Sequence, residues 1–378
     1  MGRRLAPSPS RWEDQSMTSV SSDTASAPLP AHWYADEQQS RDERDLIFHR
    51  SWQVAGLSKD VREPQSMTTA NIAGMPVVIT RDAEGELHAM LNVCLHRGAV
   101  IAQGSGPAKL LQCPNHAWVY GLDGKLKSAP RTEREDDYSC EGMDLKPVAV
   151  LEWGPLLMVN LDADAEPPTA ELATMQESVE RYGFAFDQLE PMPEEFVWEI
   201  DCDWKILMEN YLECYHCATV HKDFSQVIDV SPERYALSSD GILLTANAPV
   251  RETSKIEQQQ KILATADGPI TDSHWHLLFP ATTFSVYPGE GAMEITWYWP
   301  TGVSQSKARC IFFKMPGASD EYIKQLTEFG IQVMEEDNAL CALMQEGMTS
   351  GAIASARPLP KSEALIVAFQ KLVRRALA

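Results

Sequence analysis

Two short loops, each carrying one cysteine and one histidine, constrain this chain more than any other feature. They contain Cys94 and His96 in the first loop and Cys113 and His116 in the second, with sixteen residues between His96 and Cys113. Thiolates and imidazoles are metal ligands, and two such loops can close on a single centre. Gly98 lies two residues after His96 and allows the tight turn that such a loop needs.

A [2Fe-2S] cluster fits these four ligands if the two thiolates hold one iron and the two neutral imidazoles hold the other. Imidazoles in place of two thiolates remove negative charge and raise the potential to roughly -150 to +300 mV, so the cluster accepts electrons readily from a flavin or ferredoxin. A structural zinc site with two cysteines and two histidines is the alternative. Zinc fingers pair their cysteines, whereas each loop here alternates cysteine and histidine, and this order favours the cluster.

A second group of candidate ligands lies in the segment Asn210–His221, which contains His216 and His221. On a helix that loosens locally, residues five apart can still reach a common point. Two imidazoles and a distant carboxylate form the facial triad that leaves positions on iron(II) open for dioxygen. Two ordinary histidines on a helix are the alternative interpretation.

The third ligand must come from elsewhere in the chain. We expect a long helix over residues 319–347, because Ser319 is a good N-cap and apolar residues recur after it at helical intervals. This helix contains the acidic run Glu335-Glu-Asp337. On charge pattern alone, such a run reads as a solvated acidic turn.

Taken together, these segments resemble the α subunits of Rieske-type ring-hydroxylating oxygenases. The segments Cys94–Gly98 and Cys113–Trp118 resemble the Rieske motif, and Asn210–His221 resembles the iron-binding motif of the same family. The resemblance covers the chain except for its first 30 or so residues. Leu95 stands where proline is common and Asn115 where an aromatic residue is common, but neither is a ligand position.

The resemblance implies roles for two carboxylates. It selects Asp337 as the third iron ligand, after which the family's Gln-x-Gly follows here as Gln345-Glu-Gly347. It implies that Glu213 bridges two metal centres, accepting one hydrogen bond from His216 and another from His116 of the partner subunit. A carboxylate in this position orients a metal-bound imidazole and raises its basicity.

The residue type at position 213 narrows the resemblance further. Most relatives carry aspartate there, whereas glutamate and the surrounding Tyr211–Cys217 resemble the branch that acts on carnitine, choline and glycine betaine. Cys214 and Cys217 also form a Cys-x-x-Cys pattern, but we interpret them as non-redox residues because His216 lies between them and the run is apolar.

The implied function is that of a terminal oxygenase component. It uses dioxygen and electrons from a separate flavin and iron-sulfur reductase or ferredoxin, and NAD(P)H acts only through that reductase. The expected reaction is monooxygenation of a C–H bond in a quaternary ammonium substrate, with C–N cleavage or N-demethylation. The alternatives are ring dihydroxylation or O-demethylation of an aromatic acid and, outside enzymes, a Rieske electron carrier. An electron path between subunits implies a homotrimer.

A cationic N-methyl substrate needs an aromatic lining, because a quaternary ammonium over a ring face gains roughly 0.5–2 kcal/mol. The candidates are Tyr215, Trp275, Phe284 and Tyr287, although each could instead fill the core of a sheet. The polar stretch 248–272 reads as a mobile loop over the mouth of the site.

The implied fold is α+β, with an antiparallel β Rieske domain and a helix-grip catalytic domain whose antiparallel sheet is covered by helices. We divide the chain into a disordered leader (1–30), a helical segment that packs on the catalytic domain (31–52), the cluster domain (53–165) and the catalytic domain (166–378). Local patterns predict one helix over 32–52, strands over 75–80, 87–91, 153–160 and 293–299, and a helix over 170–182.

Composition excludes two classes of partner. The net charge of -22 argues against nucleic acid. A membrane span needs about eighteen consecutive apolar residues, and the sequence contains no such run. Eight scattered cysteines favour a reducing cytoplasm over a disulfide scaffold.

Overall fold

The computed structural model describes residues 28–378 except 183–185, 253–254, 258–259, 262–267 and 269. The α-helices are α1 Glu37–Leu46, α2 Thr169–Glu180, α3 Trp204–Tyr211, α4 Cys217–Val220, α5 Lys222–Val227, α6 Asp320–Thr349 and α7 Ala364–Leu377. Short 3-10 helices are η1 Ala31–Tyr34, η2 Phe48–Arg50, η3 Ser58–Val61, η4 Thr132–Arg134 and η5 Phe186–Gln188.

The larger part of the molecule is built on a seven-stranded antiparallel sheet, counted over the residues described. Its strand order is β11-β17-β16-β15-β14-β13-β12. The bounds are β11 Glu190–Ile200, β12 Ala236–Asp240, β13 Leu243–Pro249, β14 Asp272–Leu278, β15 Thr282–Tyr287, β16 Ala292–Gly302 and β17 Gln305–Lys314. Because side chains alternate along a strand, each strand contributes residues to both faces of this sheet.

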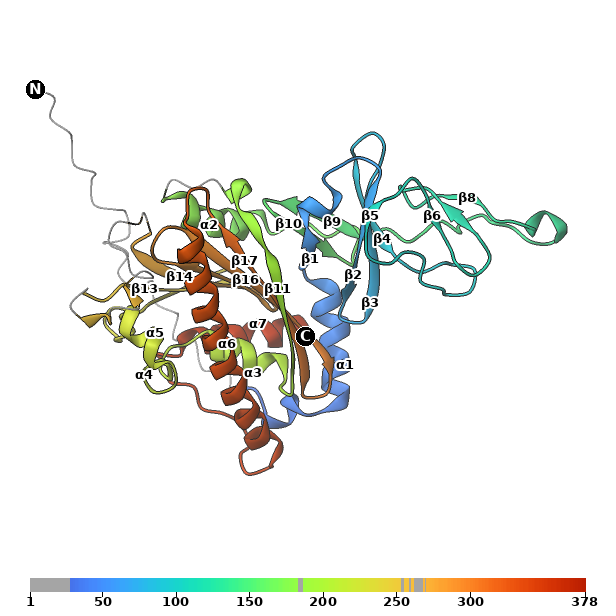
Figure 1. Cartoon of the computed structure of the whole chain (residues 1–378). Helices are drawn as coiled ribbons and strands as arrows, with labels where there is room; N and C mark the ends of the chain where they lie inside the picture. Colours follow the sequence, from blue (N-terminus) through green and yellow to red (C-terminus); the bar gives the residue numbers. More distant parts are fainter. Residues whose placement is uncertain (1–27, 183–185, 253–254, 258–259, 262–267, 269) are drawn as a thin grey trace, which may run out of the picture.

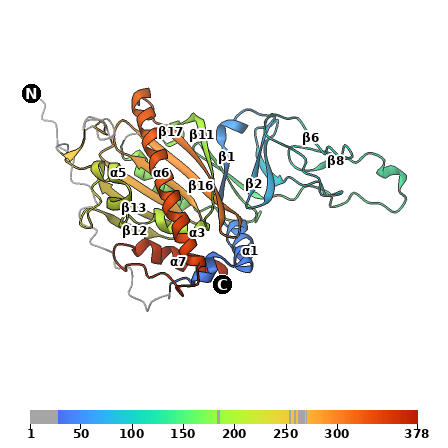
Figure 2. The same ribbon diagram turned by 60° about the horizontal axis from the view of Figure 1, so that its bottom comes forward.

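One face of the sheet is covered by α6, as Figures 1 and 2 both show, with α3 and α7 beside it. Ser319 caps α6 by accepting a hydrogen bond from Tyr322 N at 3.2 Å, and Asp320 and Glu321 place negative charge in its first turn. This confirms the predicted long helix and its N-cap. Helix α6 is thirty residues long, and Asp337 lies near the middle of this helix.

The smaller part extends from one side of the main body (Figure 1). It contains a four-stranded sheet in the order β4-β3-β2-β5, a three-stranded sheet β6-β7-β8, and a three-stranded sheet β1-β10-β9 next to the main body. The bounds are β1 Gln53–Leu57, β2 Ser66–Ile72, β3 Met75–Arg81, β4 Leu87–Leu91, β5 Ser105–Pro107, β6 Leu111–Gln112, β7 Val119–Tyr120, β8 Leu126–Ser128, β9 Ala149–Trp153 and β10 Leu156–Asn160.

A shared apolar core joins the two parts. Leu156 and Met158 of β10 belong to the same buried cluster as Leu172 and Met175 of α2 and Phe284 of the large sheet. The fold class predicted from the sequence, an antiparallel β domain beside a sheet covered by helices, is therefore confirmed.

Most of the individual strands and helices predicted from the sequence are present in the structure. The strands expected over 75–80, 87–91 and 293–299 and the helix over 170–182 are present as β3, β4, β16 and α2. The strand expected over 153–160 is β10, which begins at Leu156 because Gly154 and Pro155 form the turn after β9.

The single helix expected over 32–52 was wrong. Only Glu37–Leu46 is α-helical, and 3-10 helices lie on either side of it. Ile47 and Phe48 follow the helix and enter the core of the larger part. Most of the leader expected over 1–30, and much of the mobile loop expected over 248–272, lie outside the described residues.

Over the part of the chain that the structure describes, no helix combines the length and the apolar character needed to cross a membrane.

Candidate metal centres

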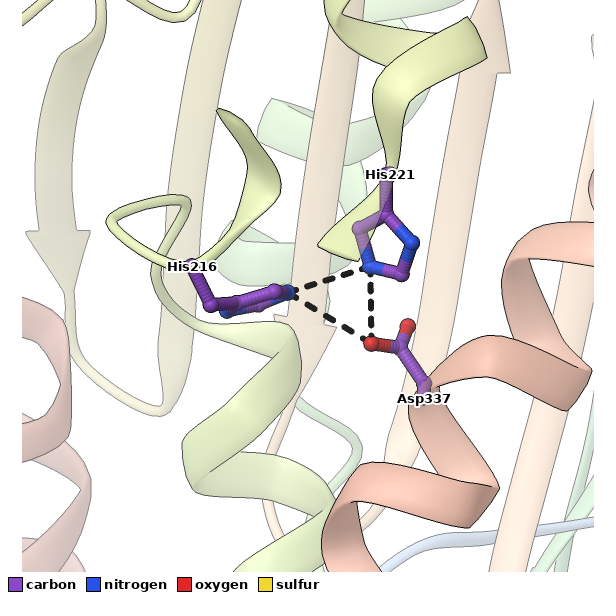
Figure 3. Close-up of side chains that lie close together, drawn as sticks. All are labelled: His216, His221 and Asp337. Carbon is purple, nitrogen blue, oxygen red and sulfur yellow. Dashed lines mark hydrogen bonds and ion pairs between the residues drawn. The ribbon is translucent and has the colours of Figure 1, made fainter. Parts of the chain in front are cut away.

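Two histidines and one aspartate from three separate segments meet in the larger part of the molecule (Figure 3). His216 directly precedes α4, His221 lies between α4 and α5, and Asp337 projects from α6. The Nε2 atoms of the two histidines are 3.1 Å apart. Asp337 Oδ1 lies 2.9 Å from His221 Nε2 and 3.4 Å from His216 Nε2.

This triangle has the dimensions of one face of a metal coordination sphere. Two donors that each lie about 2.1 Å from a metal and at right angles to one another are roughly 3.0 Å apart. The three separations of 2.9–3.4 Å match that value. The residues therefore fit a mononuclear metal bound through one face, with the opposite face free for small molecules.

The chain does not run through this site as one helix. Helix α3 ends at Tyr211 and α4 begins at Cys217, so the intervening turn breaks the helical spacing assumed from the sequence. The short helix α4 lies between His216 and His221 and ends at His221, whose φ of -101° and ψ of 72° are not helical, so residues five apart can point at the same atom. Cys214 lies in the turn between α3 and α4 and Cys217 begins α4, and the structure joins them in a disulfide, with their Cα atoms 4.9 Å apart. These cysteines were interpreted from the sequence as non-redox residues, and the disulfide was not anticipated. It forms because the turn before α4 brings the two side chains together.

Each candidate histidine has a carboxylate on its other ring nitrogen. His216 Nδ1 contacts Glu213, and His221 Nδ1 lies 2.7 Å from Glu336 Oε2. Both imidazoles thus have the carboxylate partner that fixes the ring and its tautomer in carboxylate–histidine–metal sites. Sequence reasoning anticipated Glu213 but missed Glu336, which it assigned to a solvated acidic turn.

Asn210 is a further residue that the sequence did not single out. Its Nδ2 atom donates a hydrogen bond of 2.7 Å to Asp337 Oδ1. This bond ties the end of α3 to the ligand on α6 and restrains the orientation of the carboxylate.

Hydrogen bonds between the two histidines and Asp337 shift the pKa values of these groups in opposite directions. Burial lowers the pKa of His216, but hydrogen bonds to Asp337 and Glu213 outweigh it and raise that pKa to about 9. Burial alone would raise the pKa of Asp337, but the two histidines hold it at about 2. His216 therefore carries a proton at neutral pH when no metal is bound, and a metal ion must displace it.

The two cysteine and histidine loops have the same backbone design. Cys94 N donates to Ala99 O at 2.8 Å, and Cys113 N donates to Trp118 O at 2.8 Å. Four residues after each cysteine, Gly98 N and Ala117 N donate back to the cysteine carbonyl. Both of these residues have positive φ, 73° and 57° respectively. In the second loop alanine, not glycine, takes this left-handed position, which the sequence does not reveal.

The four side chains of these loops suit a cluster with one buried and one outer iron. Cys94 and Cys113 are buried, and Tyr120 Oη lies 3.3 Å from Cys94 Sγ. The rings of His96 and His116 have centroids 4.7 Å apart, and His116 is exposed. The thiols thus lie inside and the imidazoles outside, as expected for a [2Fe-2S] cluster that transfers electrons through its histidines.

The aromatic residues expected to line a substrate site separate into three groups. Trp275 and Tyr287 are buried on the face of the sheet that α6 covers. Phe284 lies on the opposite face, because side chains alternate along β15, and it packs edge-on against Trp153 at 5.9 Å. Tyr215 is 69% exposed. The expectation for Phe284 was therefore wrong, and Tyr215 lies at the surface.

Comparison with known proteins gives this arrangement a family. Residues 186–378 match the model of the ring hydroxylating alpha subunit (catalytic domain), and residues 51–149 match that of the Rieske [2Fe-2S] domain. The chain belongs to the ring-hydroxylating oxygenase α-subunit family. This Rieske oxygenase is thus an oxidoreductase that uses a Rieske [2Fe-2S] cluster, a mononuclear iron and dioxygen. The catalytic domain excludes the alternative of a simple electron carrier, and the Rieske domain excludes structural zinc.

The relatives of this oxygenase confirm the branch indicated by the sequence. It is 29% identical to the chloroplastic choline monooxygenase of Beta vulgaris over 338 residues, which cover 87% of this chain and 72% of the relative. It is 28% identical to the carnitine monooxygenase oxygenase subunit of Escherichia coli (strain K12) over 334 residues, which cover 85% of this chain and 84% of the relative.

Solved structures share the whole architecture. The quaternary ammonium Rieske monooxygenase CntA in complex with substrate gamma-butyrobetaine superposes with a TM-score of 0.78 at 25% identity, covering 93% of this chain and 95% of that chain. Naphthalene 1,2-dioxygenase from Rhodococcus sp. superposes with a TM-score of 0.75 at 15% identity, covering 93% and 94% of the two chains. The latter likeness concerns the fold alone.

Proposed function

We propose that this oxygenase is the terminal component of a monooxygenase that acts on a quaternary ammonium compound. Relatives named for choline and carnitine, together with a solved structure that holds gamma-butyrobetaine, are the observation that carries this proposal. One oxygen atom of dioxygen enters a C–H bond next to nitrogen and the other leaves as water, using two electrons and two protons. The resulting carbon bears both hydroxyl and nitrogen, so it collapses to a carbonyl with loss of the amine and a proton.

We assign the metal ligands residue by residue. His216, His221 and Asp337 would hold the mononuclear iron, whose open positions supply dioxygen chemistry when it is bound. Their separations of 2.9–3.4 Å support this assignment. Asn210 would orient Asp337 through its 2.7 Å hydrogen bond.

For the cluster, we assign Cys94 and Cys113 to one iron and His96 and His116 to the other. The matching hydrogen bonds of the two loops and the buried thiols support this division. We place the enzyme in the cytoplasm, where a reducing environment keeps these thiols available. A separate flavin and iron-sulfur reductase or ferredoxin would supply electrons from NAD(P)H.

We also keep the division of the chain near residue 165 as a proposal. Antiparallel pairing of β1 with β10 supports a cluster domain over 53–165. Contacts of the N-terminal segment with the larger part, such as the 2.8 Å hydrogen bond from Trp204 Nε1 to Glu43, support its assignment to the catalytic domain.

Electron transfer would run between subunits through Glu213. The loops next to β6 lie at one end of the molecule, whereas α4 and α5 lie at the other end (Figure 1). His116 is exposed at its end, and Tyr215, 69% exposed, lies two residues from Glu213 at the other. A contact between these two ends in a ring of three subunits would let Glu213 accept a hydrogen bond from His116 of the partner subunit.

A matched pair of variants tests this electron path. Glu213→Gln and Glu336→Gln each change the carboxylate on one candidate ligand histidine, but only Glu213 lies on the proposed path. Both variants should weaken iron binding by about 10- to 100-fold. After saturation with iron, Glu336→Gln should regain single-turnover transfer from the reduced cluster, whereas Glu213→Gln should not. Equal recovery of the two variants would refute the path, as would turnover by a monomer in ultracentrifugation.

The substrate class is tested with wild-type enzyme and a supplied reductase. Choline, L-carnitine, gamma-butyrobetaine and glycine betaine are compared with a panel of aromatic acids, and product is measured against dioxygen consumed. Coupled turnover of at least one quaternary amine is expected. Coupled turnover of aromatic acids alone would support the alternative of ring hydroxylation or O-demethylation.

A further inference from the structure

A buried carboxylate lies in the layer between the large sheet and α6. Glu294 of β16 is 4% exposed, and its neighbours across the sheet are Ser285 of β15 and Phe312 of β17. It points toward α6, since a Cβ added to Gly330 of that helix would lie 3.4 Å from Glu294 Oε2. Sequence reasoning did not single out this residue.

Glu294 has neutral hydrogen-bond donors but no cationic partner among the residues described. Tyr287 Oη donates to one carboxylate oxygen at 2.8 Å, and Thr296 Oγ1 donates to the other at 2.9 Å. Lys205 is the only buried lysine or arginine in the described part of the chain, and it pairs with Glu43 and Asp203. Burial raises the pKa of Glu294 although both donors oppose this. A carboxylate fixed by two donors but lacking a cation is costly to ionise unless a cation arrives from outside the chain.

Two tyrosines lie beside this carboxylate: Tyr287 donates to it, and Tyr211 Oη is 3.2 Å from Oγ of Ser285, the cross-strand neighbour of Glu294. Tyr298 follows Glu294 on the same face of β16. Burial raises the pKa of the Tyr211, Tyr287 and Tyr298 hydroxyls, and the nearby charge of Glu294 raises each of them further. A quaternary ammonium group has no N–H to donate, so it is recognised by negative charge and by the faces of aromatic rings. Glu294 and these tyrosines supply both.

The position of Glu294 along α6 relates it to the iron ligands. Gly330, which faces Glu294, and Asp337 are seven residues apart on this helix, which is two turns or about 10 Å along its axis. Residues seven apart also lie on nearly the same face of a helix. Met334, between them, receives a contact of 3.6 Å from Tyr298 Oη. A head group held by Glu294 would thus lie between the carboxylate and the metal site.

We propose that Glu294 is the counter-ion that binds the quaternary ammonium head group and so sets the preference of this enzyme for cationic substrates. The inference rests on the proposed function, because it names the residue that selects that substrate class. This role also gives a reason for the two hydrogen bonds that Tyr287 and Thr296 donate to Glu294. A carboxylate in a constant position keeps the substrate nitrogen, and the carbon next to it, at a constant distance from the metal ligands.

The test compares each cation with its uncharged carbon analogue. The pairs are choline with 3,3-dimethylbutan-1-ol, and gamma-butyrobetaine with 5,5-dimethylhexanoate, in which carbon replaces the ammonium nitrogen. Binding to the holoenzyme is measured by calorimetry for the wild type, Glu294→Gln and the control Tyr287→Phe, which keeps the carboxylate but loses one donor. Iron content and melting temperature are recorded for each variant.

Glu294→Gln should weaken cation binding by about 10- to 100-fold, because a full charge at close range is lost. It should change the affinity for the carbon analogue less than about threefold, whereas Tyr287→Phe should keep the wild-type preference for the cation. If Glu294→Gln does not fold, Glu294→Leu replaces it, since apolar replacement of a buried carboxylate is often tolerated.

The outcomes separate the two proposals. Suppose the wild type binds the cations more tightly than their carbon analogues and Glu294→Gln shows the same difference. The role of Glu294 is then refuted while the substrate class stands. Equal losses for the cation and its carbon analogue would show a structural role and also refute the inference. If the wild type binds no quaternary amine, the proposed function fails and the inference fails with it.

Discussion

A buried ion pair made by Lys205 joins the N-terminal segment to α3, and a substitution can test its contribution to stability. The lysine lies on α3, and its side chain is 0% exposed. Its Nζ atom donates to both oxygens of Glu43 on α1 at 2.7 Å and lies 2.9 Å from Asp203 Oδ1. Burial lowers the pKa of Lys205, but the two carboxylates outweigh it and raise that pKa, so the lysine is charged in the folded protein.

Lys205→Met removes the cation and leaves Glu43 buried without compensation. Removal of one partner from a buried pair costs about 3–5 kcal/mol. At about 2–4 °C per kcal/mol, the melting temperature should fall by roughly 6–20 °C. Adding Glu43→Gln to this variant removes the uncompensated charge and should restore at least half of the loss. Calorimetry of the iron-loaded proteins measures both shifts. A fall below 2 °C, or a further fall in the double variant, would refute the charge argument.

Two further predictions concern the metal site and the response to acid. Asp337→Ala should lose the mononuclear iron but keep the colour and EPR signal of the cluster, and retained iron would mean that another carboxylate is the ligand. Burial lowers the pKa of His274 and His276 to about 3, with Arg181 contributing to both. Neutral His276 thus stabilises the fold above pH 6.5, and this contribution is lost toward pH 3, by about 1.4 kcal/mol per pH unit. His276→Gln should reduce the change in the free energy of unfolding between pH 7 and pH 5, measured by urea titration, by about 2 kcal/mol, and a change equal to the wild type's would refute this.

The sequence predicted the elements that neighbouring residues determine, such as a capped helix with regular apolar spacing. Helix α6 was predicted from its Ser319 cap and its apolar spacing, and the structure confirms both. The short segment 31–52 was mispredicted because its apolar residues serve the core of the larger part, not one face of a helix. Propensity and periodicity cannot register a break that tertiary packing imposes.

The residues of the candidate site also differ in whether their neighbours in the sequence reveal them. His216 and His221 could be found from their spacing, but Asp337 needed the family resemblance, because an acidic run on a helix has no local mark of metal binding. Glu336 was missed because its partner His221 lies more than a hundred residues away. Glu294 was missed because nothing local shows that α6 buries it. Phe284 was misassigned because an aromatic residue on a strand gives no sign of which face it occupies.

The continuity of α6 has a consequence for how substrate choice in this enzyme could change. The single continuous helix α6 carries the proposed iron ligand Asp337 and, two turns earlier, Gly330 beside the proposed head-group site. Under these assignments, a shift or bend of α6 would change both sites at once. New specificities should therefore arise by exchange of side chains on the strands opposite, with the helix left in place.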